Sequence, residues 1–157
     1  MRRHTDNDGE RLTQQGVADA EAIGQELQPP YSAFVSSGAE RSTEMLGILR
    51  RAAGQEETPI QEAAGLRSAV EDRWRDAAKA AGKGADVEAI RAVDPEFVER
   101  ESWLLGLTLR GIADGLPDGG RALVVGHSPT NEAAVLGLTG EVVPPDGQGR
   151  RDPVGRG

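Results

Sequence analysis

The sequence predicts a three-layer α/β/α protein, in which helices cover both faces of a mainly parallel central sheet and a helical insertion occupies the middle third. Apolar runs of strand length, of which residues 31–35 and 121–126 are the clearest, alternate with longer segments whose apolar residues recur at helical spacing. Such alternation is typical of a parallel sheet, because parallel strands need crossover connections, usually helices. A length of 157 residues is typical of one domain.

The first 60 residues contain a strand–helix pattern that repeats. Thr13 is a suitable N-cap, and apolar residues follow it at helical spacing until Pro29-Pro30, which cannot continue a helix. Upstream of Thr13, Asn7-Asp8-Gly9 has the composition of a turn. The elements expected here are a strand at the first residues, a helix from Thr13 to Leu27, a strand from Tyr31 to Val35, a helix from Ala39 to Ala53 and an edge strand at Thr58-Pro59-Ile60.

The middle third is charged and helical, and we interpret about 66–93 as an insertion rather than a second domain. A break at Gly82-Lys83-Gly84 divides it, and Asp94 followed by Pro95 marks the next helix, with Asp94 as its cap. The expected elements are helices from Leu66 to Ala81, Asp86 to Val93 and Pro95 to Gly115, a buried strand from Arg121 to Gly126 and a helix from Thr130 to Leu138.

Residues 1–140 are then expected to form a single domain. Residues 141–157 are rich in glycine and proline and poor in apolar side chains, which predicts a flexible tail. Within this tail only Glu141-Val142-Val143 has the composition of a further strand.

Composition excludes several classes of function. The formal net charge of -8 argues against nucleic acid as a partner, although a local basic pocket is compatible with an anionic substrate. Zero cysteines exclude disulfides, thiolate metal ligands and a cysteine nucleophile, and no motif has metal-ligand spacing. No apolar run approaches the length of a membrane span, and Arg2-Arg3 is not followed by the apolar region of a signal peptide. We therefore expect a cytoplasmic protein.

Three strand-to-helix junctions carry the residues that suit phosphate chemistry: Arg3-His4, Arg41 and His127. In an open parallel sheet, ligands bind at the carboxyl ends of the strands, where helix N-termini also favour phosphate. Arginine forks bind phosphate oxygens, and a neutral imidazole is a nucleophile towards phosphorus. Because the chain has no cysteine, a histidine is the best candidate for covalent catalysis, and the three junctions together predict a phosphate site.

Each of these residues also has a purely structural interpretation. An Arg-His pair near an N-terminus is usually solvated, a histidine after an apolar strand is often structural, and Arg41 on a helix is by default a surface cation. Trp74 and Trp103 are expected to pack in the core or cap, and Glu71-Asp72-Arg73 is expected on a solvated helix face. The equivalent positions of the three junctions favour the functional interpretation.

These motifs resemble the histidine phosphatase superfamily, which includes the cofactor-dependent phosphoglycerate mutases. The matching segments span residues 1 to about 138 in the family's order and are Arg3-His4, Leu12-Thr13-Gln14-Gln15-Gly16 with the helix to Leu27, residues 35–44, and Val124-Val125-Gly126-His127. The resemblance implies that His4 is the nucleophile that becomes phosphorylated and that Arg3, Arg41 and His127 bind the phosphoryl group. It also implies a mainly parallel sheet with helices on both sides and a phosphatase that needs no metal or organic cofactor.

Three positions depart from the family's pattern. Thr5 stands where the family usually has glycine, so its backbone must keep a negative φ. The family's apolar first strand, central in its sheet, is represented here only by Met1 and Arg2. The glutamate that serves many members as general acid, in a Leu-x-Glu context, is replaced by Ser68. The candidate replacements are Glu71 and Asp72, and then Asp6 and Glu10.

We therefore expect a small phosphatase that hydrolyses a phosphomonoester, or a protein phosphohistidine, through a covalent phosphohistidine at His4. Its substrate would be a phosphorylated small molecule or a phosphoprotein, and the short chain favours hydrolysis over the phosphoryl shuttling of a mutase. The alternative is a catalytically impaired phosphate-binding or interaction module of the same fold, because the acid and the first strand depart from the family. A third reading is the same fold with no phosphate function.

Overall fold

The computed structural model, which describes residues 1–143, is built on a four-stranded parallel sheet in the order β1-β6-β4-β5. The strands of this sheet are β1 (Arg2–Arg3), β4 (Ala33–Ser36), β5 (Ile60–Glu62) and β6 (Ala122–Gly126), and a separate antiparallel hairpin consists of β2 (Asn7–Asp8) and β3 (Arg11–Leu12). The helices are α1 (Gln14–Gln25), α2 (Glu40–Ala52), α3 (Glu71–Ala81), α4 (Val87–Val93), α5 (Pro95–Asp114) and α6 (Thr130–Thr139), with a 3-10 turn η1 (Ala64–Leu66).

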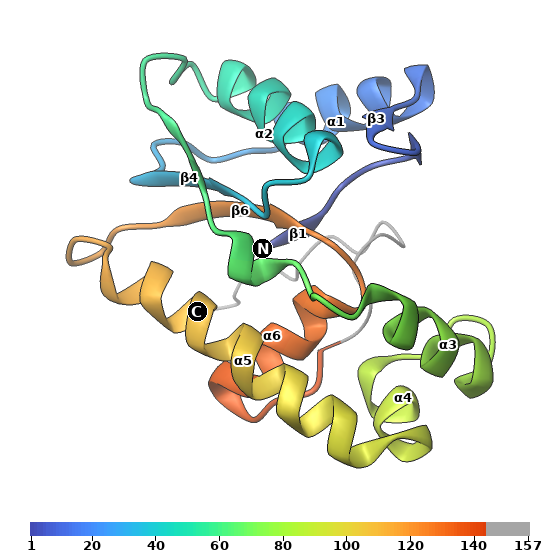
Figure 1. Ribbon diagram of the computed structural model, residues 1–157. Helices are drawn as coiled ribbons and strands as arrows, with labels where there is room; N and C mark the ends of the chain where they lie inside the picture. Colours follow the sequence, from blue (N-terminus) through green and yellow to red (C-terminus); the bar gives the residue numbers. More distant parts are fainter. Residues whose placement is uncertain (144–157) are drawn as a thin grey trace.

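Helices cover both faces of the sheet, and the predicted α/β fold with a helical insertion between β5 and β6 is confirmed. In Figure 1, α1 and α2 lie on one face, α5 and α6 lie on the other, and α3 and α4 lie near one end of α5. Helices α5 and α6 approach closely at Gly137, where a Cβ atom would lie 1.7 Å from the backbone oxygen of Ser102. Only glycine permits this crossing.

The side chains of β4 and β6 alternate between the two faces. Phe34, Leu123 and Val125 pack against buried residues of α1 and α2, whereas Val35 and Val124 belong to the core on the other face. Because helices cover both faces, these strands have no polar side, and their residues form continuous apolar runs in the sequence. This explains why they were the clearest strand signals.

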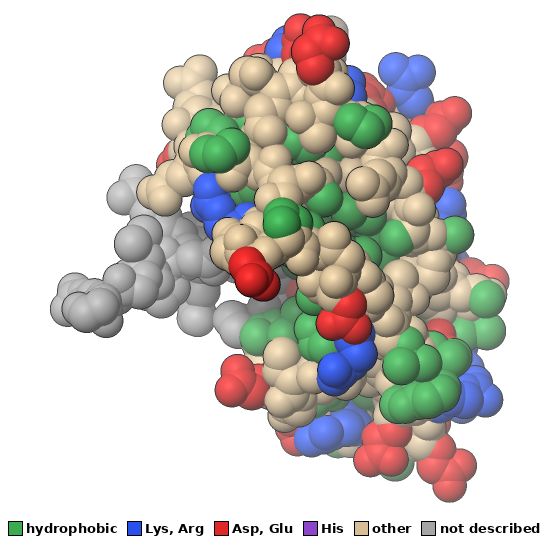
Figure 2. Space-filling model, turned by 90° about the vertical axis from the view of Figure 1, so that its left-hand side faces the viewer, with side chains coloured by type: hydrophobic (Ala, Val, Ile, Leu, Met, Phe, Trp, Pro, Cys, Tyr) green, Lys and Arg blue, Asp and Glu red, His purple; other side chains and the backbone are tan. Residues whose placement is uncertain are grey.

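Figure 2 shows one face of the molecule, on which apolar side chains gather mainly in the middle and charged ones lie mostly towards the rim. No histidine side chain is visible on this face. Among residues 1–143, no helix is both long enough and apolar enough to cross a membrane.

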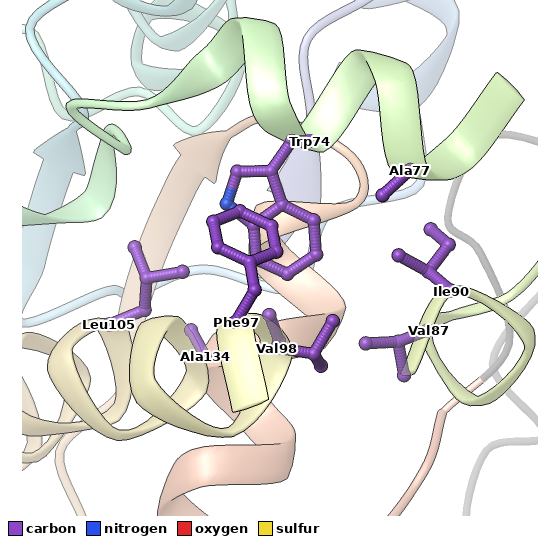
Figure 3. Close-up of a cluster of buried hydrophobic side chains, with 9 residues drawn as sticks. Trp74, Ala77, Val87, Ile90, Phe97, Val98, Leu105 and Ala134 are labelled. Atoms are coloured by element: carbon purple, nitrogen blue, oxygen red, sulfur yellow. The ribbon is translucent and has the colours of Figure 1, made fainter. Parts of the chain in front are cut away.

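The helical insertion has a core of its own, formed with α5 and α6. Figure 3 shows Trp74 of α3 packed against Phe97 of α5, among side chains from α4 and α6; the two rings are tilted by 58°, with centroids 4.9 Å apart. Trp74 is only 2% exposed, as expected for core packing. The same expectation was wrong for Trp103, which is 60% exposed. The buried face of α5 consists of residues 97, 98, 101, 102, 105 and 106, so Trp103 projects from another side of the helix.

One predicted helix boundary and one predicted side-chain cap were wrong. Helix α3 begins at Glu71, not at Leu66, because Leu66 is buried in the core beside the sheet and ends the separate turn η1. Asp94 occupies the N-cap position of α5, but its side chain does not cap the helix; it accepts a hydrogen bond from Arg73 Nη2 over 2.8 Å. Asp86 does cap α4 as its position suggests, accepting from the backbone N–H of Ala89 over 2.9 Å.

The two ends of the described chain differ from the family's pattern. Strand β1 has two residues and lies at the edge of this sheet, next to β6, whereas the resemblance implies a central first strand. Residues 141–143 have no regular structure, so the possible further strand at Glu141-Val142-Val143 is absent. The rest of the expected flexible tail, 144–157, lies outside the described residues.

Candidate active site

Arg41 lies between the two histidines, at the carboxyl ends of three neighbouring strands. His4 follows β1, His127 follows β6, and Arg41 is in the first turn of α2, which follows β4. Because β1, β6 and β4 are adjacent and parallel, their carboxyl ends meet at one edge of the sheet. Arg41 Nε donates a hydrogen bond to His4 Nε2 over 3.1 Å, and Arg41 Nη2 lies 3.3 Å from His127 Nδ1. The structure thus brings three predicted site residues together.

His4 is held as a neutral imidazole whose Nε2 faces Arg41. Its ring is 8% exposed, and Nδ1 lies 2.9 Å from the carbonyl oxygen of Thr5. A guanidinium only donates hydrogen bonds, so Nε2 is the acceptor and Nδ1–H donates to Thr5. Burial lowers the pKa of His4 and the positive charges of Arg41 and Arg3 lower it further, while the bond to Thr5 opposes them. The unprotonated Nε2 is the atom that a nucleophilic role requires.

His127 is neutral as well, but in the opposite tautomer. Its Nδ1 accepts from Arg41, so its proton is on Nε2, which lies 2.8 Å from Ser37 Oγ. Its backbone N–H donates to Asn131 Oδ1 over 3.1 Å, which ties the residue to α6. Burial, followed by the charge of Arg41, lowers the pKa of His127 to about 4. The rings of His4 and His127 meet edge to face with centroids 5.2 Å apart.

The segment after His4 is fixed by the start of α1. Thr13 caps this helix, accepting from the Gly16 backbone N–H over 3.0 Å, and Thr5 Oγ donates to the Gly16 carbonyl over 2.7 Å. A Cβ atom on Gly16 would lie 1.9 Å from the backbone oxygen of Asp6, so only glycine allows this contact. No non-glycine residue within 1–143 has a positive φ. The backbone of Thr5 therefore has the negative φ that its β-branched side chain requires.

Arg3 contributes charge from the edge of the sheet. It pairs with Gly126 in the register of β1 and β6, and its side chain is exposed. Its positive charge is close enough to lower the pKa of His4. The predicted phosphate-binding role of Arg3 is compatible with this position.

A third arginine, Arg67, lies beside the histidine–arginine cluster, and sequence reasoning missed it as a site residue. Arg67 Nη2 is 3.6 Å from Glu10 Oε1, and the same Glu10 oxygen accepts from Arg41 Nη1 over 3.0 Å. Arg67 Nε also donates to Glu71 Oε1 over 2.6 Å. The signal for Arg67 was present, because it directly precedes Ser68, the position where the resemblance leads us to expect the acid.

Glu71 is near the site but is not in the state that a general acid needs. The hydrogen bond from Arg67 holds the pKa of Glu71 below its ordinary value, and the positive charges of Arg67 and Arg41 act in the same direction. A general acid at neutral pH needs a raised pKa. Of the weaker candidates, Asp72 pairs with Arg75 on an exposed helix face, and Asp6 accepts from Thr13 Oγ.

Ser68, at the position where the resemblance leads us to expect the acid, is linked to a buried carboxylate. Its hydroxyl donates to Glu101 Oε1 over 2.5 Å, and both residues are buried. A cavity of about 520 Å³, lined by residues 67–73, opens beside this pair and Arg67. Within residues 1–143, no group of three or more His, Asp or Glu side chains is placed to hold a metal ion.

The parallel sheet, with a histidine–arginine cluster at its carboxyl edge, defines an α/β protein of the histidine phosphatase fold. The chain is similar to the crystal structure of phosphoglycerate mutase from Bacillus anthracis str. Sterne, with a TM-score of 0.63 and 22% sequence identity. The similarity covers 87% of this chain and 73% of that one. No protein-family model and no curated protein sequence matches the chain. At this level of identity the likeness shows the fold, and the fold inferred from the motifs is confirmed.

Proposed function

We propose that this protein is a phosphatase that hydrolyses a phosphomonoester, or a phosphohistidine of another protein, through a phosphohistidine at His4. The observation that carries this proposal is the single guanidinium of Arg41 between two buried, neutral imidazoles. A neutral imidazole attacks phosphorus, and a guanidinium beside it stabilises the charge on the phosphoryl oxygens in the transition state. The expected substrate is a phosphorylated small molecule or a phosphoprotein.

The first step forms a phosphorus–nitrogen bond. The lone pair of His4 Nε2 attacks phosphorus, the bond from phosphorus to the leaving oxygen breaks, and that oxygen takes up a proton from a general acid. The Thr5 carbonyl, which accepts the Nδ1 proton of His4, stabilises the positive charge that develops on the ring. Arg41 and Arg3 are assigned to the phosphoryl oxygens. His127 is assigned to them as well, and to donate a hydrogen bond there it needs a proton on Nδ1, which the other tautomer or the protonated ring supplies.

The second step returns the enzyme to its starting state. A water molecule attacks phosphorus, the phosphorus–nitrogen bond breaks and its electron pair returns to Nε2. The proton lost by the water passes to the group that acted as the acid, now a base. Inorganic phosphate is then released.

Glu71 is the first candidate for the proton transfers, because its partner Arg67 shares Glu10 with Arg41 at the site. To donate a proton it must be released from its hydrogen bond with Arg67. A phosphohistidine substrate makes a smaller demand, since its leaving nitrogen can be protonated before the bond breaks. This favours a phosphohistidine over an alkyl phosphate as the better substrate.

A second candidate function is a phosphate-binding module without turnover. Two observations favour it: a serine at position 68, where the family carries its acid, and the low pKa of Glu71. The cluster of Arg41, His4 and His127 would then bind a phosphoryl group without transferring it.

Covalent labelling separates the two functions. The purified protein is incubated with radiolabelled phosphoramidate, quenched in base, and examined for acid-labile phosphate on histidine. We expect label on the native protein and none on His4→Ala, with His4→Gln as a second control of similar size. Turnover of p-nitrophenyl phosphate is followed in the same preparations.

An absence of both label and turnover in a folded native protein would reject the phosphatase. Retention of phosphate or vanadate binding in that case would favour the module. Equal labelling of the native protein and His4→Ala would reject His4 as the nucleophile.

A further inference from the structure

The carboxylate of Glu10 lies between two guanidinium groups at the candidate site. One oxygen, Oε1, accepts a hydrogen bond from Arg41 Nη1 over 3.0 Å and forms an ion pair with Arg67 Nη2 over 3.6 Å. Glu10 is in the turn between β2 and β3, and its side chain is 49% exposed, so it can leave this position without opening the core. Arg41, in contrast, is held on both sides by the histidines and is only 13% exposed.

Arg67 is positioned independently of Glu10. Its Nε donates to Glu71 Oε1 over 2.6 Å, and residue 67 directly follows η1, whose last residue, Leu66, is buried in the core. Glu71 therefore engages Nε, while Nη2 is directed towards the same oxygen of Glu10 that Arg41 binds. An anion between the two arginines would be bound from two directions.

An oxygen shared by two guanidinium groups marks the place where a phosphate oxygen would bind. Carboxylates and phosphates accept the same charge-assisted hydrogen bonds from arginine. A phosphate and the Glu10 carboxylate are both negatively charged and repel each other at close range. They therefore compete for the position between Arg41 and Arg67. The ion pairs of Glu10 are partly exposed to water and therefore weak, which makes its displacement feasible.

We propose that Arg67 is a further phosphate-binding residue of this site, and that Glu10 occupies the shared anion position until phosphate displaces it. The inference rests on the phosphate-binding part of the proposed function, and it does not require phosphohistidine formation. Glu10 then acts as an internal competitor that weakens the binding of free phosphate.

Calorimetric titration with inorganic phosphate tests both parts at low and constant ionic strength. We expect Glu10→Gln to bind phosphate about threefold more tightly or better, because the substitution removes the competing charge. We expect Arg67→Gln to bind phosphate about threefold more weakly or worse, because one of the two cations is lost. Thermal melting of each variant verifies that it is folded.

Matched controls come from an exposed ion pair near the other end of α2. Glu56→Gln and Arg51→Gln change the net charge by the same amounts, and the pair that they break, 3.0 Å in length, involves no residue of the site. Both variants are expected to bind phosphate as the native protein does. Changes in the controls equal to those in Glu10→Gln and Arg67→Gln would reduce the effect to net charge and overturn the inference.

The phosphate titrations and the labelling of His4 can succeed or fail independently of each other. Tighter binding by Glu10→Gln and weaker binding by Arg67→Gln, without any label on His4, would support the inference while the covalent mechanism fails. Labelled His4 with unchanged phosphate affinity in both variants would overturn the inference and leave the phosphatase standing. Failure of every variant to bind phosphate would overturn it as well.

Discussion

The Nε atom of Arg41 donates a hydrogen bond to Nε2 of His4 over 3.1 Å. His4 Nε2, which would attack phosphorus, therefore accepts a hydrogen bond from Arg41, which would bind the phosphoryl oxygens. Arg41 also contacts His127 and Glu10 through its two terminal nitrogens, so one guanidinium connects all three strand ends and the β2–β3 turn. A bound phosphate would have to redirect these donors from the imidazoles to its own oxygens.

Removal of the Arg41 charge should raise the pKa of both histidines. In Arg41→Gln the positive charge that lowers both pKa values is lost, although burial continues to lower them. We expect both rings to titrate at higher pH than in the native protein. The chain has only two histidines, so the ring C–H signals in NMR spectra report both titrations without overlap from others.

The control for this titration is Arg51→Gln, which removes an exposed arginine of the same helix. It should leave both curves unchanged. A native-like titration of His127 in Arg41→Gln would mean that burial alone depresses its pKa.

His127 should make the protein less stable in mild acid. Its pKa is about 4 in the folded protein against 6.5 in the unfolded chain, so the unfolded chain binds more protons between these values. The free energy of unfolding should fall as the pH drops from 6.5 towards 4, and the full difference corresponds to about 3 kcal/mol. Urea denaturation at pH 7 and pH 4.5 measures the loss in the native protein.

His127→Gln removes the contribution of this one ring, while His4 and the carboxylates titrate in both proteins. The variant should lose roughly 2 kcal/mol less than the native protein between the two pH values. Parallel losses in both proteins would contradict the depressed pKa. The lowered pKa of His4 acts in the same direction in both proteins.

Gly16 should be intolerant of even the smallest side chain. A Cβ atom there would meet the backbone oxygen of Asp6 at 1.9 Å, and the segment that follows His4 would have to move. We expect Gly16→Ala to lower the free energy of unfolding by roughly 2 kcal/mol, as overpacking commonly does, and to weaken phosphate binding. Chemical denaturation and phosphate titration measure the two effects.

Gly47 supplies the matched substitution, since it also lies inside a helix but has open space where its Cβ would be. Gly47→Ala should raise the free energy of unfolding by up to about 1 kcal/mol, because alanine favours the helix. Equal effects of the two substitutions would show that the contact at Asp6 is unimportant.

Much of the fold followed from local patterns. Strands β4 and β6 were recognisable because helices cover both of their faces, and the cap at Thr13 was recognisable because its hydroxyl binds a backbone N–H three residues on. The start of α3 could not be predicted, since Leu66 continues the helical pattern but is drawn into the core beside the sheet. The exposure of Trp103 depends likewise on which face of α5 meets its neighbours.

For the site, the residue types and their order along the chain could be predicted from the sequence: a histidine and an arginine at equivalent strand ends, with a second histidine at the third. The geometry between them follows from the packed domain. Opposite tautomers of His4 and His127, and the shared oxygen of Glu10 between Arg41 and Arg67, depend on side chains from separate elements. Distances of about 3 Å between such groups are set by packing of the whole domain, which no local pattern encodes.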